Sequence, residues 1–183
     1  MLHVAYFYKH FNNTSMIQEY CRLRVSPLLR IALPVSYVDE VLQLKPQDIS
    51  PIPGVDPCLL GITNQRGSFL WVLLLEKFLG IKPTSLAKPI VSVSLRTQMP
   101  EVGMRRLACV VMAFEEIITL DSQKFVPVPD KLPPRAKALF SGVTKIENNT
   151  YGILNVNEIF RLLNPDVGGD EAIIAELADI STA

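Results

Sequence analysis

The stretch from Gly61 to Gly80, GITNQRGSFLWVLLLEKFLG, joins a polar tight turn to an apolar run. The turn is Asn64-Gln65-Arg66-Gly67, in which glycine lets the chain reverse sharply. The run Phe69–Leu75 contains Trp71 and is much shorter than the roughly 20 residues of a membrane-spanning helix. It therefore predicts a strand buried on both faces, with Trp71 in the core. A turn that presents an arginine thus leads directly into a core strand.

The composition narrows the class of protein. The chain has 183 residues, 49% of them hydrophobic, which suits one domain or two small halves with a shared core. The chain has 18 basic residues (Lys and Arg) and 18 acidic residues (Asp and Glu). This balanced charge disfavours nucleic acid and anionic lipid as partners. The first residues lack an apolar signal-peptide segment, and a reducing cytoplasm is the expected location.

Catalytic and metal-binding patterns are missing from the sequence. The three cysteines, Cys21, Cys58 and Cys109, are widely spaced and form no CxxC pair, so neither a zinc site nor a disulfide framework is expected. The only histidines, His3 and His10, lie in the first residues, and there is no phosphate-binding glycine motif. We therefore expect no catalytic residues, no metal and no cofactor.

Three regions are expected. Residues 1–18 are an irregular lead-in, residues 19–163 form the β domain, and residues 164–183 form a tail. Strands are predicted from alternating or continuous apolar runs between turn residues, and residues 96–106 are predicted as a polar turn region. The Glu115-Glu116 pair is expected at a solvated strand end with its side chains on opposite faces. In the tail, Ile173, Ile174, Leu177 and Ile180 recur at helical spacing in 170–180, which predicts an amphipathic helix, more often a packing element than a partner's ligand.

An internal duplication is visible. A shift of about 76 positions places Glu40 on Glu116 and Pro51-x-Pro53 on Pro127-x-Pro129. A shift of about 81 places Gly61 on Gly142. The same order of strands, turns and Pro-x-Pro segments occurs twice along the chain. This repeat predicts two small β units of about five strands each, which share core contacts. The two Pro-x-Pro segments should lie at equivalent places.

The duplication also isolates one difference. Arg66-Gly67 of the first copy falls on Glu147-Asn148 of the second. Because the second copy folds without arginine at this position, Arg66 is a candidate for binding rather than for architecture.

Together these patterns resemble the CheW-like domain family of chemotaxis coupling proteins over roughly Glu19 to Leu163. The residues that carry the resemblance are Val38-x-Glu40-Val41, Pro51-x-Pro53, Gly61-Ile62-Thr63-Asn64-Gln65-Arg66-Gly67, Leu75 with Phe78-Leu79-Gly80, Ala108-Cys109-Val110-Val111, Glu116-Ile117, Pro127-x-Pro129, Gly142-Val143 and Ile153-Leu154.

The resemblance implies a mainly β fold of two five-stranded SH3-like barrels around a joint core, with short helices. It implies a non-catalytic adaptor that couples a methyl-accepting chemotaxis receptor to the regulatory domain of a CheA-type histidine kinase. The candidate partner-binding residues are Val38, Glu40, Gly61, Asn64, Arg66 and Gly67. A regulatory or small-ligand binding module that has lost one partner is the alternative.

The sequence departs from the family pattern at three places. Gln65 stands where leucine is usual, Trp71 where proline is usual, and Leu74 where aspartate is usual. The tryptophan resembles variants that serve type IV pilus motility or phototaxis.

Two structural expectations concern the binding surface. Arg66 should project towards a groove between the two barrels and form a bidentate ion pair with Glu40. At least one barrel should expose an apolar patch to a partner.

Overall fold

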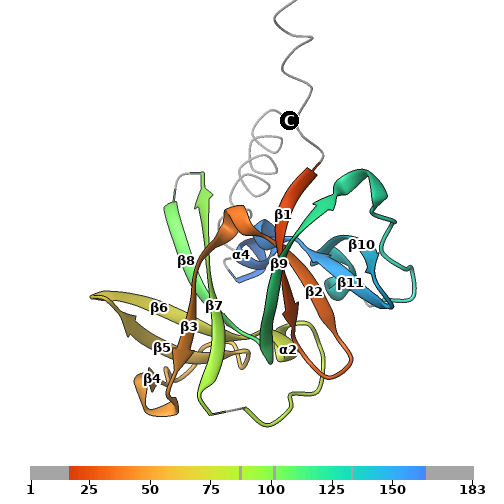
Figure 1. Cartoon of the computed structure of the whole chain (residues 1–183). Helices are drawn as coiled ribbons and strands as arrows, with labels where there is room; N and C mark the ends of the chain where they lie inside the picture. The colour runs from red at the N-terminus through yellow and green to blue at the C-terminus, as the bar shows by residue number, and fades with distance from the viewer. Residues whose placement is uncertain (1–16, 87, 101, 133, 164–183) are drawn as a thin grey trace, which may run out of the picture.

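The computed structural model describes residues 17–86, 88–100, 102–132 and 134–163, which form two mixed β-sheets with short helices (Figure 1). The five-stranded sheet has the order β10-β11-β2-β1-β9, and the six-stranded sheet has the order β3-β7-β8-β6-β5-β4. The mainly β fold of two small units is therefore confirmed. The predicted helix over 170–180 lies outside the described residues.

The elements follow from the apolar runs and the turn residues between them. The five-stranded sheet consists of β1 (Ile17–Arg24), β2 (Arg30–Pro34), β9 (Ala113–Asp121), β10 (Phe140–Ile146) and β11 (Asn149–Leu154). The six-stranded sheet consists of β3 (Val38–Leu44), β4 (Ile49–Ser50), β5 (Leu59–Gln65), β6 (Ser68–Leu74), β7 (Ile90–Met99) and β8 (Gly103–Val110). The helices are α2 (Leu75–Phe78), α3 (Pro134–Ala138) and α4 (Val156–Leu163), with short 3-10 turns η1 (Val35–Tyr37), η2 (Pro46–Asp48) and η3 (Ser122–Lys124).

The two sheets repeat one topology. The order β3-β7-β8-β6-β5 corresponds to β9-β1-β2-β11-β10, and the parallel pairs β6·β8 and β11·β2 occupy the same place in each. Along the chain, however, β1 and β2 come before the first unit and pair with strands of the second. The second unit is therefore completed by the hairpin at the start of the described chain, and the two units are interleaved.

The hairpin turns confirm the alignment of the two copies. In the first copy, the pair Gln65–Ser68 encloses Arg66 and Gly67; in the second, Ile146 and Asn149 enclose the two residues aligned with them. The first turn residue is left-handed in both copies, with φ of +51° at Arg66 and +54° at Glu147. Because Glu147 adopts the same backbone angle, the left-handed conformation belongs to the turn and does not require arginine.

The Pro-x-Pro segments also lie at equivalent places. Ser50, just before Pro51, pairs with Ile62, and Val126, just before Pro127, pairs with Val143. These bridges connect the residue before each Pro-x-Pro segment to β5 or β10, and in both strands a β-bulge lies just before the paired residue, at Gly61 and at Gly142. The prediction of equivalent placement is confirmed, and it fits proline, which has no N–H to offer to a ladder.

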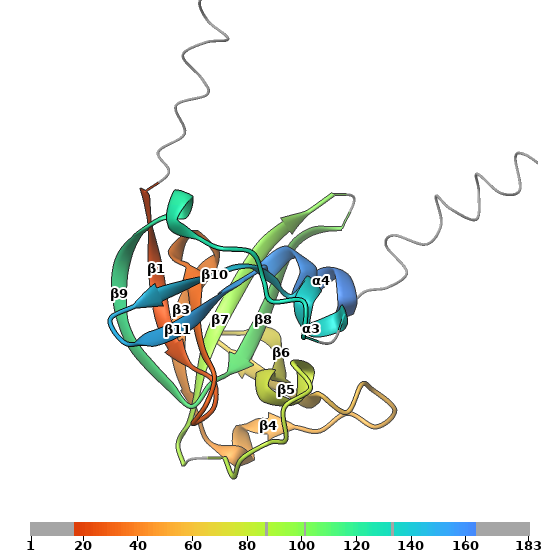
Figure 2. The ribbon, with the colours of Figure 1, turned by 90° about the vertical axis from the view of Figure 1, so that its right-hand side faces the viewer.

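The joint core joins the two sheets. One cluster of buried side chains includes Leu23 and Ile31 from the five-stranded sheet, Val93 and Leu95 from the six-stranded sheet, and Ile159 from α4. Figures 1 and 2 show α4 beside β7 and β8. Full burial of such a side chain contributes about 1.5–3 kcal/mol. Each unit thus depends on the other for part of its apolar burial.

Two expectations about strand boundaries are wrong. The first strand begins at Ile17, not at Glu19, because Ile17 to Glu19 pair with Asp121 to Thr119 of β9. Residues 96–106 are not only a turn: β7 extends to Met99 and β8 begins at Gly103, with pairing up to Met99–Gly103. Arg96 pairs with Arg106, and Thr97 with Arg105, across a long hairpin whose cross-strand hydrogen bonds outweigh the polar character of these residues.

Two further expectations about burial are wrong. Phe69 is 71% exposed and Trp71 is 37% exposed, so the first half of β6 presents one face to solvent and Trp71 is not a core residue. The Glu115 and Glu116 side chains do not diverge, because both contact Arg22. The register between β1 and β9 shifts at this point, pairing Arg22 with Glu116 and Leu23 with Phe114. Glu115 is the extra residue of a β-bulge, which breaks the usual alternation.

Candidate functional site

The turn between β5 and β6 holds Arg66 in a defined position. Arg66 and Gly67 both have positive φ, +51° and +82°. The Asn64 Oδ1 accepts a hydrogen bond from the Gly67 N–H at 2.9 Å, which fixes the backbone of the turn. The Arg66 side chain is 81% exposed. Asn64 and Gly67 therefore shape the turn, and Arg66 is the residue it presents to solvent.

Glu40 forms an ion pair with Arg66. Its Oε2 lies 3.2 Å from the Arg66 Nη2, and the same oxygen accepts a hydrogen bond from the Gln65 Nε2 at 3.4 Å. Its other oxygen, Oε1, lies 3.5 Å from the Arg106 Nη2. The predicted Arg66–Glu40 ion pair is confirmed, but it is a single contact and not the expected bidentate one, since Glu40 divides its oxygens between two arginines. The Arg66 side chain is otherwise exposed to solvent.

A β-bulge in β3 brings a second carboxylate to this place. Val38 pairs with Leu95 and Glu40 with Ser94, so Asp39 is the extra residue. Arg106 of β8 forms ion pairs with both Asp39 and Glu40. The result is a small network of alternating charge.

The second unit contains the matching acidic pair but a different arrangement. Glu115 and Glu116 converge on Arg22 of β1, whose Nη1 lies 2.5 Å from the Glu116 Oε1. Arg22 is buried and also donates to the Tyr151 hydroxyl, from Nε at 3.0 Å and from Nη2 at 2.6 Å. In the second unit, the arginine that pairs with the acidic residues, Arg22, is therefore buried. In the first unit, Arg66 pairs with Glu40 from the exposed surface.

The network lies in a hollow of about 360 Å³ formed by the six-stranded sheet alone. The lining residues come from β3, β5, β6, β7, β8 and the Arg66 turn: Asp39, Glu40, Gln65, Arg66, Ser68, Arg96, Met104 and Arg106. The expectation that Arg66 projects into a groove between the two barrels is therefore wrong. Arg66 pairs with Glu40 on β3 of its own unit and lines this hollow together with Arg106 of β8.

Val38 and Gly61, the other two candidate residues, are separated from this hollow. Val38 is half-buried and packs against the joint core. Gly61 is buried with φ of +140°, and a Cβ there would lie 2.1 Å from the Ser50 carbonyl oxygen. The structure gives Gly61 a packing role, because only glycine allows β4 to approach this closely.

A neighbouring groove of about 590 Å³ was not predicted. It is lined by the exposed Phe69 and Trp71 of β6, Met104 of β8, and Phe160 and Leu163 of α4. Met104 and Arg106 line both the groove and the Arg66–Glu40 hollow. Phe69 and Trp71 are two residues apart and so share a face of β6, but the unbroken apolar run concealed which face is open. The expected exposed apolar patch is thus present on the first unit.

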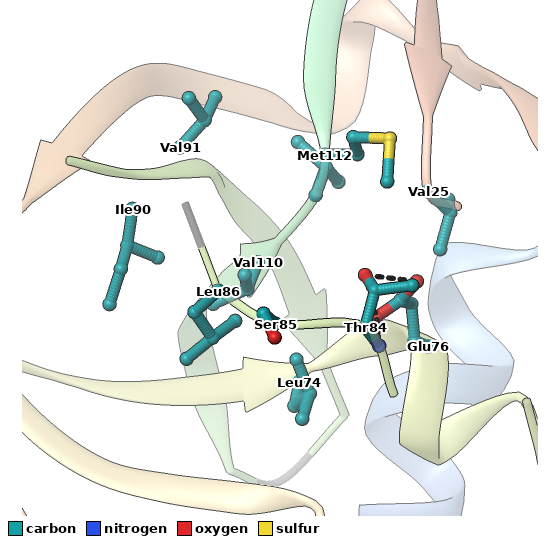
Figure 3. A pocket seen from close by; sticks show the side chains of 11 residues that line it. Val25, Leu74, Glu76, Thr84, Ser85, Leu86, Ile90, Val91, Val110 and Met112 are labelled. Carbon is teal, nitrogen blue, oxygen red and sulfur yellow. Dashed lines mark hydrogen bonds between the residues drawn. The ribbon is translucent and has the colours of Figure 1, made fainter. Parts of the chain in front are cut away.

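A third hollow is apolar and small (Figure 3). Its charged group is Glu76, which is 4% exposed and accepts hydrogen bonds from the Thr84 N–H at 3.0 Å and the Thr84 hydroxyl at 3.1 Å. Figure 3 shows Glu76 and Thr84 together at one end and Leu74, Leu86 and Ile90 at the other. This carboxylate has its partners and holds the loop that follows α2.

The thiols and carboxylates offer no reactive centre among the described residues. Burial raises the pKa of Cys58 to about 11 and that of Cys109 to about 12, so both are protonated thiols at neutral pH. Within the described ranges, no group of three His, Cys, Asp or Glu side chains could hold a metal ion. No helix in this part of the chain is long and apolar enough to cross a membrane.

The comparisons with known proteins agree with the fold. The model of the CheW-like domain family matches residues 23–164, and the chain belongs to this family of non-catalytic scaffolding domains of chemotaxis signalling. Among solved structures, the chain is similar to the scaffolding protein TtCheW from Thermoanaerobacter tengcongensis. The identity is 22%, the TM-score is 0.62, and the similarity covers 76% of this chain and 89% of that one. No curated protein sequence matches the chain.

Proposed function

We propose that this chain is a cytoplasmic adaptor that couples a methyl-accepting chemotaxis-type receptor to the regulatory domain of a CheA-type histidine kinase. The Arg66 turn is the contact on which the proposal depends. Arg66 is 81% exposed and is tethered by one ion pair to Glu40, while the equivalent turn carries Glu147 with the same backbone angle. The fold needs the turn but not the arginine, which supports a role in binding.

Arginine in this setting suits a partner contact. Its planar guanidinium has five N–H donors, and Glu40 takes up part of them. Arginine is also enriched among the residues that dominate binding energy at interfaces. The adjoining exposed Phe69, Trp71 and Met104 supply apolar area for an interface of the usual total size, about 1,200–2,000 Å².

The departures from the family pattern support a role in the choice of partner. Gln65 donates to Glu40 beside Arg66, and Trp71 lies in the exposed groove, whereas Leu74 is buried. Two of the three departures are therefore on the surface proposed to meet a partner. On this basis we propose the branch of the family that serves type IV pilus motility or phototaxis. Receptors and kinases of such a system should bind the chain more tightly than flagellar ones.

The test is Arg66→Ala, with Glu147→Ala as the matched control at the equivalent turn. Arg66→Ala removes an ion pair that is exposed on its arginine side, so the unfolding free energy should fall by only about 0–1 kcal/mol, and Glu147→Ala removes no ion pair among the described residues and should change it no more. Binding to the kinase regulatory domain or to the receptor signalling tip, measured by calorimetry, should weaken at least about tenfold in Arg66→Ala, equivalent to about 1.4 kcal/mol. Glu147→Ala should bind normally. Normal binding by both variants would remove Arg66 from the site, and lost stability with normal binding would make it structural.

A further inference from the structure

We propose that the C-terminal segment of this chain, residues 170–180, docks as an amphipathic helix in the groove of Phe69, Trp71, Met104, Phe160 and Leu163. This occupant goes beyond the adaptor function, because it is part of the chain itself. The groove measures about 590 Å³ and is lined by the exposed aromatic side chains of Phe69 and Trp71. A soluble surface rarely leaves such a patch uncovered without a partner.

The connectivity favours this occupant. Helix α4 ends at Leu163, and Leu163 itself lines the groove, so the chain enters the segment 164–183 at the site it would fill. Six residues, Asn164 to Gly169, separate Leu163 from Asp170. A linker of that length reaches up to about 20 Å. A helix over the eleven positions 170–180 would be about 16 Å long, comparable to the width of a few strands.

The chemistry of the segment matches the groove. Ile173, Ile174, Leu177 and Ile180 fall on one helical face, opposite Ala175 and Asp179. Residues 164–183 contain five acidic side chains and no basic one: Asp166, Asp170, Glu171, Glu176 and Asp179. The residues that line the groove include Arg105 and Arg106 and no carboxylate. The apolar face of the segment therefore matches the apolar lining of the groove, and its acidic side chains match Arg105 and Arg106.

Tethering makes weak affinity sufficient. A short flexible linker gives the attached segment an effective concentration on the order of 1 mM. A helix that would bind the groove with a dissociation constant near that value as a free peptide would therefore be about half docked in the intact chain.

The docked segment would compete with a partner. Because Met104 and Arg106 line both the groove and the Arg66–Glu40 hollow, a protein that binds Arg66 must approach the covered groove. Docking thus lowers the apparent affinity for that partner, since only the open fraction of the chain binds.

The test uses the full chain and its only tryptophan, Trp71. Leu177→Glu places a charge on the apolar face of the segment, and Ala175→Glu adds the same charge on the opposite face as the control. We expect Leu177→Glu to shift the Trp71 emission to longer wavelength and to increase its quenching by acrylamide. Ala175→Glu should match the natural sequence. Equal Trp71 exposure in all three proteins, or an equal change in both variants, would overturn the proposal.

A distance measurement separates docking within one chain from docking between copies. Ser181→Cys carries a thiol-reactive dansyl acceptor, since the three natural thiols are buried. Energy transfer from Trp71 should be high, should fall in the Leu177→Glu background, and should survive dilution with excess unlabelled chain. Loss of transfer on that dilution would mean exchange with a second copy and would overturn the intramolecular proposal. Both readouts are independent of receptor and kinase, so their failure is distinguishable from failure of the adaptor function.

Discussion

Replacing Gly61 by alanine tests whether this position serves packing, as the structure indicates, or partner binding. The added Cβ would lie 2.1 Å from the Ser50 carbonyl oxygen and 2.8 Å from the Pro51 Cα, so the β4 backbone must move. The φ of +140° adds backbone strain of about 1–3 kcal/mol for a residue with a side chain. Forced repacking adds a further 1–3 kcal/mol or so. Gly61→Ala should therefore lose about 2–6 kcal/mol of stability, a fall in Tm of roughly 5–20 °C for a domain of this size.

Gly142→Ala is the matched control, because Gly142 occupies the equivalent bulge of the second unit. There the Cβ would lie 3.2 Å from the Val126 carbonyl oxygen, and φ is not in the left-handed region. The alanine also restricts the unfolded chain, which stabilises the fold by about 0.4–1 kcal/mol and offsets the tighter contact. Urea denaturation should place this variant within about 1 kcal/mol of the natural sequence. A loss in Gly142→Ala as large as that in Gly61→Ala would refute the steric reasoning.

Two further predictions concern buried groups. Arg22→Met should cost about 2–4 kcal/mol in urea denaturation, because it leaves the Tyr151 hydroxyl and the Glu115 carboxylate without their cation; a loss below about 0.5 kcal/mol would show that water replaces it. None of the three thiols should react with Ellman's reagent at pH 8 until the chain unfolds, and fast reaction of the folded chain would contradict the burial. Because burial raises the pKa of Cys109 from 9.0 to about 12, its contribution to stability is complete below pH 9 and is lost as the pH rises towards 12. Cys109→Ala should therefore show a shallower loss of stability between those values.

The sequence was informative where the signal is local. The Arg66-Gly67 turn, its match to Glu147-Asn148 and the paired Pro-x-Pro segments could be predicted, because turn type depends on a few neighbouring residues. The Arg66–Glu40 pair was also found, because the duplication left the arginine unexplained by the fold.

The wrong predictions concern features that depend on tertiary contacts. A β-bulge brings Asp39 beside Glu40 and Glu115 beside Glu116, and nothing in the strand period of two reveals it. Phe69 and Trp71 line one groove with Phe160 and Leu163 of α4, about 90 residues later in the chain, so their surroundings depend on a distant segment. The placement of the Arg66 hollow within one unit likewise depends on tertiary pairing, because its lining residues come from five strands and one turn of the six-stranded sheet.

The interleaved order of strands has a consequence for synthesis of the protein. Strand β2 ends at Pro34, while its parallel partner β11 ends at Leu154, 120 residues later. At about 5–20 residues per second, the β1–β2 hairpin leaves the ribosome roughly 6–24 s before its sheet can be completed. During this interval the edge of β2 lacks its neighbour and is open to wrong pairing, as unpaired edges are. The first unit meets no such delay, because all its strands lie between Val38 and Val110. Nascent chains arrested after the first unit should therefore carry a paired six-stranded sheet held by its own cluster around Leu70, Val72 and Ala108. Its joint-core face stays incompletely covered, and the β1–β2 hairpin still lacks its partners β9 and β11.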